Sequence, residues 1–433
     1  MLFYTLLGHC AHAFNKSSTI DLSLLCFFGL RIYGYFAPMS ALLHTLSEMR
    51  KNRSLWVWSL FLLAGIAVTL RNVLMPSDGP FGHFNNYIIF QNAFYHWWEV
   101  KNLYISYPSE QYDLFKYSPF FAMCFGAFAW LPPKLGLLLW NLLNFSVLAY
   151  ALQKLKLQPA QLLAFGLMLI QETITAGINS QSNALIAGLL ILAFTSLEKD
   201  KWWQAAFFIS ATVFIKLFGI LFFALFLCYP KWYRGIVPAL VICTGMLLLP
   251  AISGGIRGFT MQLQGYMDLL ANDHNSFVKY SVMGWLQSWF GLQPNKNLVV
   301  ISGLLLQVAL TVYISLKNTQ YASRAILAGT WLIWMVIFNH MAESATFVIA
   351  VVGVLLWFFY SQFPKYIKLT VLVFVLAFTC FGPSDIYPPE WRQKIVIDWQ
   401  LKVFPCILAW AVAIIELLKG SIYSEAKQPP LPL

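Results

Sequence analysis

The feature that most constrains this chain is a succession of apolar runs of membrane-spanning length, separated by short polar patches. The first strong run covers 55–70, and others follow almost to the C-terminus. A hydrocarbon core of about 30 Å needs about 20 apolar residues per helical crossing. In total, 59% of the 433 residues are hydrophobic and 10% are charged, against about 25% charged residues in a soluble domain. We therefore expect an all-α, polytopic membrane protein.

The apolar runs predict about 12 crossings. Each crossing is expected to be a helix, because a single strand cannot satisfy its backbone polar groups in lipid. The predicted crossings are 56–74, 118–132, 135–153, 159–175, 182–197, 204–228, 235–252, 298–316, 323–339, 345–361, 366–382 and 402–418.

The distribution of lysine and arginine predicts the orientation of these crossings. A basic patch at 49–53 directly precedes the first run, which places the N-terminal side in the cytoplasm. Counting from there, most basic loops fall inside, but the loops at 154–156 and 199–201 fall outside. The same count places three longer polar segments outside, and a site that faces water is expected among them. These segments are 75–117, 253–297 and 383–401.

The first 48 residues differ from the rest of the chain. They hold only a weak apolar stretch, which Arg31 and Pro38 interrupt. We interpret 1–48 as an N-terminal extension that is either not native or poorly ordered, with Met49 as the alternative start. The membrane domain is expected to cover 49–420, and 421–433 is expected to be a cytoplasmic tail.

Composition and motifs exclude several classes of function. The formal charge of +11 resides mostly in short loops between apolar runs, which is typical of membrane topology rather than of a nucleic-acid partner. The seven cysteines show no CxxC or Cys/His ligand spacing, so we expect packing roles and no metal site. P-loop, Rossmann, GxSxG and HExxH motifs are absent, and no cofactor is expected.

The outer loop at 75–117 combines a helical pattern with polar side chains. Aromatic and aliphatic residues recur at helical spacing over 84–98, which predicts a helix lying in the membrane interface. Asp113 and Lys116 follow among tyrosines, at the mouth of the second predicted crossing. An interfacial belt of Trp and Tyr accounts for part of this pattern, but not for the amides and carboxylates that gather in one loop.

Lys216 lies in the middle of the apolar run 207–223. An ionisable residue at membrane depth indicates a functional site by default. The alternatives are a structural lysine paired with a buried carboxylate such as Glu172, or a lysine at the junction of two half-helices.

Two further polar groups interrupt apolar runs. Asn339, His340 and Glu343 close the ninth predicted crossing, and His340 and Glu343 would share a helix face if that helix continued. A satisfied interfacial histidine is the alternative. Between crossings four and five, polar residues at 171–183 predict a break that lines a cavity or a loop.

Several of these segments together resemble glycosyltransferase family 87. They are Lys-Tyr-Ser-Pro at 116–119, Leu-Pro at 131–132, Leu-Trp-Asn-Leu-Leu-Asn at 139–144, Gln-Ser-Asn-Ala-Leu at 181–185 and Ile-Lys at 215–216. The likeness extends over most of 55–400.

The resemblance implies a GT-C-like fold with a long first outer loop. It also implies a polyprenyl-phosphate-linked sugar donor, a lipid or glycan acceptor, and transfer of a hexose such as mannose on the outer face of the cytoplasmic membrane. The predicted substrate-binding residues are Asn85, Asn86, Tyr87, Lys116, Tyr117, Gln181, Lys216, Asn339, His340 and Glu343.

The family carries an acidic base at the start of the first outer loop. Here His83 occupies the matching position in His-Phe-Asn-Asn-Tyr. The role of base is therefore open among Asp78, His83 and Asp113, or the chain is a degenerate, non-catalytic homologue. A lipid or sugar transporter is the other alternative, although transporters usually show two related halves, and no internal repeat is evident in the sequence.

Overall fold

The structure is a computed structural model, and it describes residues 53–76, 79, 81–273, 278, 280–317 and 320–419. The predicted extension at 1–48, the tail at 421–433 and the candidate base Asp78 lie outside these residues.

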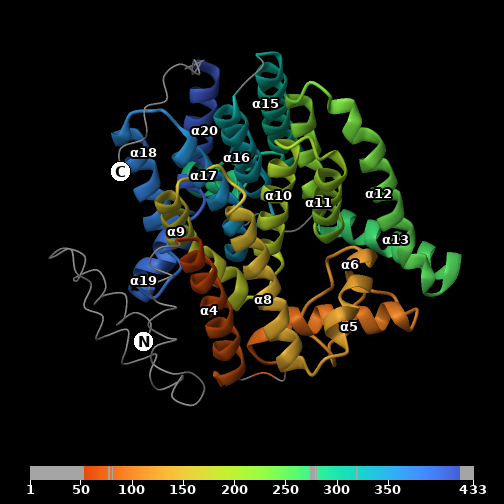
Figure 1. Cartoon of the computed structure of the whole chain (residues 1–433). Coiled ribbons are helices and arrows are strands. Elements are labelled where there is room, and N and C mark those ends of the chain that lie inside the picture. The colour runs from red at the N-terminus through yellow and green to blue at the C-terminus, as the bar shows by residue number, and fades with distance from the viewer. Residues whose placement is uncertain are drawn as a thin grey trace, which may run out of the picture. The chain divides into compact units, whose positions relative to one another are not determined.

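Every regular element in the described ranges is a helix, as the apolar runs predict (Figure 1). In chain order these elements are α4 (Arg53–Leu74), η1 (Gly82–Phe84), α5 (Asn85–Trp98), α6 (Pro119–Cys124), α7 (Gly126–Ala129), α8 (Pro133–Leu152), α9 (Pro159–Ile178), α10 (Asn183–Leu197), α11 (Trp202–Ile215), η2 (Leu217–Cys228), η3 (Trp232–Gly235), α12 (Ile236–Leu248), η4 (Leu249–Ile252), α13 (Gly255–Asp273), α14 (Val282–Phe290), α15 (Lys296–Leu316), α16 (Tyr321–Ile337), η5 (Ser344–Thr346), α17 (Phe347–Tyr360), α18 (Lys365–Phe374), η6 (Val375–Cys380), α19 (Pro389–Arg392), η7 (Gln393–Asp398) and α20 (Phe404–Lys419).

Among the residues that the structure describes, five helical segments are long and apolar enough to cross a membrane, and several other apolar helices are shorter. The five are Ser54–Leu74, Pro133–Leu152, Pro159–Ile178, Trp232–Ile252 and Lys296–Leu316. The all-α membrane class is therefore confirmed, whereas the number of crossings stays a prediction.

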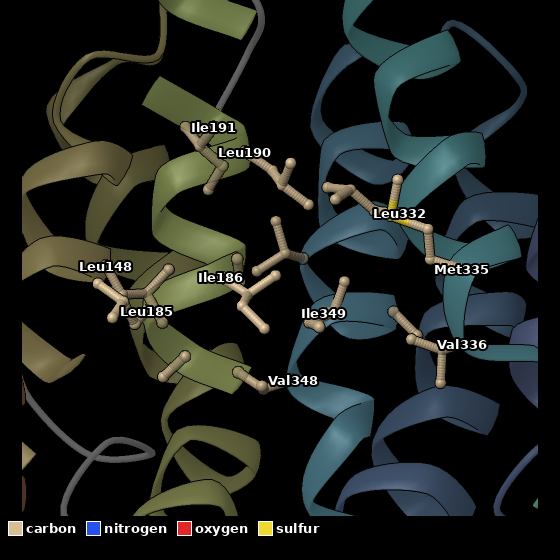
Figure 2. Packing of buried hydrophobic residues seen from close by; sticks show 14 of the residues in the cluster. Leu148, Leu185, Ile186, Leu190, Ile191, Leu332, Met335, Val336, Val348 and Ile349 are labelled. Carbon is tan, nitrogen blue, oxygen red and sulfur yellow. The ribbon is translucent and has the colours of Figure 1, made fainter. Parts of the chain in front are cut away.

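The core lies where α10 faces α16 and α17. Figure 2 shows Ile186 and Leu190 of α10 directed toward Ile349 of α17, with side chains of α16 behind it. A Cβ added at Gly329 of α16 would lie 2.6 Å from the carbonyl oxygen of Gly353 in α17. These two glycines let the α16 and α17 backbones touch, as small residues do in membrane helix pairs.

The predicted single crossing at 204–228 is wrong, because the chain reverses at Lys216. That residue has an extended backbone (φ −138°, ψ 125°) between α11 and η2. The two helices run back side by side, so the Trp202 ring at the start of α11 lies 5.5 Å from the Phe226 ring near the end of η2. A Cβ at Gly219 would collide with Thr212, which is why a glycine is needed here. Hydropathy measures apolarity but not chain direction.

The predicted crossing at 118–132 is also wrong. The structure has α6 and α7 there, of six and four residues, and about 11 residues of helix extend only about 16 Å. The carbonyl of Ala129 accepts hydrogen bonds from Gln91 and Tyr95 of α5. This segment therefore packs on α5, which runs crosswise to α4 and α8 in Figure 1.

These two corrections move the loops at 154–156 and 199–201 to the same end as the other basic loops. Glu198 at the end of α10 pairs with Arg324 at the start of α16 at 2.6 Å, and it accepts from Tyr229 after η2 at 2.6 Å. The Lys156 amide donates to the Tyr321 hydroxyl at 3.2 Å. The expected outer placement of the two loops is therefore wrong.

Candidate functional site

Four segments that are far apart in the sequence meet around one polar network. Gln181 and Asn183 lie at the turn between α9 and α10, and Lys216 is the tip of the α11–η2 hairpin. Glu343 lies in the turn between α16 and α17, and Tyr117 directly precedes α6. In the text below, "polar network" means these five residues.

The hydrogen bonds of the polar network form a continuous chain. Lys216 Nζ donates to Asn183 Oδ1 at 2.8 Å, and Asn183 Nδ2 donates to Gln181 Oε1 at 2.5 Å. Gln181 Nε2 then donates to Glu343 Oε2 at 2.7 Å. Lysine can only donate and carboxylate can only accept, so both amide orientations are determined by the two ends of the chain.

The polar network runs from the interior to the surface. Asn183 is fully buried and Gln181 is nearly so, Lys216 is half-buried, and Glu343 is exposed. The turn that carries the two amides is tight, because Ser180 adopts a left-handed conformation with φ 52°. The Trp140 indole donates to the carbonyl of Ser180 at 2.9 Å and holds that turn.

Tyr117 supplies the aromatic side of the network. The Lys216 ammonium lies 5.5 Å from the centre of its ring, within cation–π range. The ring packs on Phe90 and Phe121 at 4.8 and 4.7 Å. Burial raises the pKa of Tyr117 above its usual range, so the phenol stays protonated and neutral. The neighbouring Ser118 hydroxyl donates to the carbonyl of Phe214 and ties this segment to α11.

The alternative pairing of Lys216 with Glu172 is wrong. Glu172 of α9 instead pairs with Lys402 at 2.8 Å, and both side chains are fully buried. Lys402 was not among the predicted site residues, although a glutamate within an apolar helix requires a buried cation. The other alternative, a lysine at the junction of two half-helices, describes the observed place of Lys216.

His340 and Glu343 do not share a helix face, because α16 ends at Ile337. Asn339 and His340 lie in the turn that follows, where Asn339 Oδ1 accepts from the Met341 amide at 3.0 Å. The Glu343 side chain caps η5. His340 is half-buried in the same turn.

The predicted residues at the start of α5 divide into two groups. Asn86 Nδ2 donates to the carbonyl of Asn179 at 2.7 Å, two residues before Gln181. Asn85 instead binds another part of the outer loop, and Tyr87 binds α7. Asn85 Oδ1 accepts from the Tyr112 amide at 3.1 Å, and the buried Tyr87 hydroxyl donates to the Phe128 carbonyl at 3.1 Å.

The candidate bases that the structure describes lie on the exposed outer loop. His83 is exposed, and its Nε2 lies 2.7 Å from the carbonyl oxygen of Pro76. Asp113 is exposed, and its Oδ1 accepts from the Leu114 amide at 2.7 Å. Lys116 is half-buried, next to Tyr117 of the network. Among the described residues, the hydrogen bonds of the His83 and Asp113 side chains stay within the outer loop.

Asn183 belongs to the Gln-Ser-Asn-Ala-Leu segment at 181–185 that resembles the family, but it is not among the predicted site residues. Its signal in the sequence was the spacing of two amides at the start of an apolar run. Among the residues that the structure describes, no group of three or more His, Cys, Asp or Glu side chains could hold a metal ion.

Comparison with known proteins identifies the family of the chain. The family model of glycosyltransferase family 87 matches residues 115–381, which is more than half of the chain and includes the whole polar network. No curated protein matches the sequence. The chain is a membrane glycosyltransferase and belongs to glycosyltransferase family 87.

Proposed function

We propose that this protein moves a hexose, with mannose as the first candidate, from a polyprenyl-phosphate donor to a lipid or glycan acceptor. The observation that carries the proposal is the polar network, in which a lysine at the tip of an apolar hairpin is held by amides. In this reaction the acceptor oxygen attacks the anomeric carbon, and the sugar–phosphate bond breaks. The polyprenyl phosphate leaves with the bonding electrons, and a nearby cation stabilises the charge that develops on it.

Lys216 is the proposed cation for the leaving phosphate. Its Nζ carries three donors, and Asn183 accepts from one of them. The hairpin presents this charge next to apolar helices that suit a lipid tail. Lys116 and His340 are the other proposed cations; both are half-buried in turns near Tyr117 and Glu343.

The proposed reaction takes place on the outer face of the cytoplasmic membrane. The polar network lies at the ends of α9 and α16 and at the starts of α10 and α17. The basic loops at 154–156, 199–201 and 317–324 lie at the opposite ends of these helices. Because basic loops face the cytoplasm, this distribution supports an extracytoplasmic site.

The proposed base is Asp78, with His83 and Asp113 as alternatives. A base within hydrogen-bond reach of the acceptor hydroxyl is needed for the attack. If His83 takes the role, Nδ1 is the basic atom, because Nε2 donates to the Pro76 carbonyl. Asp78→Asn should abolish transfer without loss of protein from the membrane. An active Asp78→Asn together with an inactive His83→Ala would assign the role to His83, and inactivity of Asp113→Asn alone would assign it to Asp113.

The test uses the purified full-length chain in liposomes with radiolabelled mannosyl polyprenyl phosphate and acceptor lipids, without nucleotide sugar. Transfer of label to a product that is not the donor supports the proposal, and Lys216→Ala serves as the matched inactive protein. A panel of polyprenyl-phosphate hexoses identifies the sugar. Movement of the intact donor across the bilayer without a new glycosidic bond would instead identify a carrier. The absence of both transfer and movement would identify a degenerate homologue.

A further inference from the structure

The amide chain between Lys216 and Glu343 separates a cation from an anion by two neutral groups. All three hydrogen bonds point in the same direction, from the ammonium to the carboxylate. Aligned bonds of this kind polarise one another in a low-dielectric interior. Among the described residues, Glu343 therefore orients the amides and acts on Lys216 electrostatically, without a hydrogen bond between the carboxylate and the ammonium.

Asn183 is the rigid member of this chain. Its Nδ2 donates to Gln181 and also to the carbonyl of Ala345 at 3.0 Å, so both of its amide hydrogens are used. Its Oδ1 is thereby directed at Lys216. Rotation of this amide would break all three bonds and turn an NH₂ group toward the ammonium.

We propose that Asn183 and Gln181 are positioning residues, which hold the Lys216 ammonium in place and charged for the phosphate of the donor. This inference rests on the proposed function and adds a role for two residues that need not touch the substrate. Asn183 orients Lys216 directly, and Gln181 acts one bond further away by fixing the orientation of Asn183.

The matched control is Asn144 of α8. It is a second buried asparagine that holds the start of α10, because its Oδ1 accepts from the Leu185 amide at 3.1 Å and its Nδ2 donates to the Trp140 carbonyl. In the part of the chain that the structure describes, no hydrogen bond joins Asn144 to Lys216. Asn144→Ala removes a buried amide from the same helix start without removing an acceptor from the lysine.

The experiment is a double-mutant cycle on donor kcat/KM with the full-length chain. Asn183→Ala should lower kcat/KM on the order of tenfold to a hundredfold, because small misplacements of a catalytic group have such effects. In a Lys216→Met background the same change should have no further effect. Gln181→Leu should give a smaller loss that also disappears in that background, whereas the effect of Asn144→Ala should be the same in both backgrounds.

A second measurement does not require transfer. Polyprenyl phosphate without sugar should bind the protein, and the resulting increase in its melting temperature in detergent measures this binding. Binding should be weaker in Asn183→Ala and in Lys216→Met, and no weaker still in the double variant.

Additive losses in either measurement, or Asn183→Ala with wild-type kcat/KM, would overturn the positioning role even if the wild-type chain transfers sugar. If the wild-type chain transfers nothing but the binding cycle is non-additive, the proposed function fails and the positioning of Lys216 stands. If Asn183→Ala does not fold, the Gln181→Leu cycle decides in the same way.

Discussion

Lys216 and Lys402 both lie inside an otherwise apolar set of helices, but their charges are balanced differently. Lys402 is fully buried and donates to Glu172 at 2.8 Å and to the Thr379 carbonyl at 2.8 Å. Lys216 is half-buried and donates a hydrogen bond to a neutral amide, that of Asn183.

Under the proposed function, the difference separates a structural lysine from the lysine that would bind the donor phosphate. The ion pair of Lys402 links α9 to the chain between η6 and α20, 230 residues further on. An ammonium that is neutralised by a carboxylate does not bind a second anion strongly. Lys216 instead donates to a neutral amide and interacts with the exposed Glu343 only electrostatically, which leaves its ammonium for the donor phosphate in the proposed reaction.

The largest expected effect comes from breaking the structural pair. Lys402→Met leaves Glu172 charged and unpaired in the interior, which should cost about 3–5 kcal/mol of the free energy of unfolding. Unfolding in detergent by titration with SDS measures the loss. Glu172→Leu combined with Lys402→Met should recover most of it, since no buried charge remains. A double variant as unstable as the single one would show that this pair does not act as a unit.

Lys216→Met should show the opposite pattern. Loss of a group that stabilises the leaving phosphate should lower kcat about 10²–10³-fold, while the melting temperature in detergent changes less than in Lys402→Met. Glu343, the carboxylate that interacts electrostatically with Lys216, is exposed, so removal of the ammonium leaves no buried carboxylate unpaired among the described residues. An equal loss of stability in Lys216→Met and Lys402→Met would contradict the proposed difference between the two lysines.

A smaller effect is expected at the base of the hairpin that carries Lys216. Glu198 accepts from Arg324 at 2.6 and 2.8 Å and from Tyr229 at 2.6 Å. Glu198→Gln should cost about 1.5–3 kcal/mol, the range for hydrogen bonds to a charged group, and should lower kcat through the displaced hairpin. Arg392→Ala breaks an exposed ion pair with Asp385 and is the control, with an expected change below about 1 kcal/mol.

The smallest effect is expected at Tyr117. Tyr117→Phe keeps the ring beside the Lys216 ammonium and its packing on Phe90, and it removes only the hydroxyl. Donor kcat/KM should stay within about twofold, while Tyr117→Leu should lose about 0.5–2 kcal/mol of binding to the cation. A large defect in Tyr117→Phe would assign the role to the hydroxyl instead of the ring.

Local pattern was sufficient for part of the site. The helix predicted over 84–98 is present as α5, and the polar break before α10 places Gln181 and Asn183 at a turn. Polar residues are scarce in the apolar runs, and each one indicates a site because a buried polar group needs a hydrogen-bond partner. The predictions failed where a segment's direction mattered, at 118–132 and 204–228, since two short helices and one long one can have the same hydropathy.

The sequence by itself determined that this chain is helical and embedded in a membrane, because runs of apolar residues cannot be hidden otherwise. It also determined the family, through short motifs between 115 and 381. Only the tertiary structure decided that the chain reverses at Lys216 and that Glu172 belongs to Lys402. Partners separated by 230 residues leave no local periodicity, and which of the two lysines pairs with a buried carboxylate depends on how the helices pack.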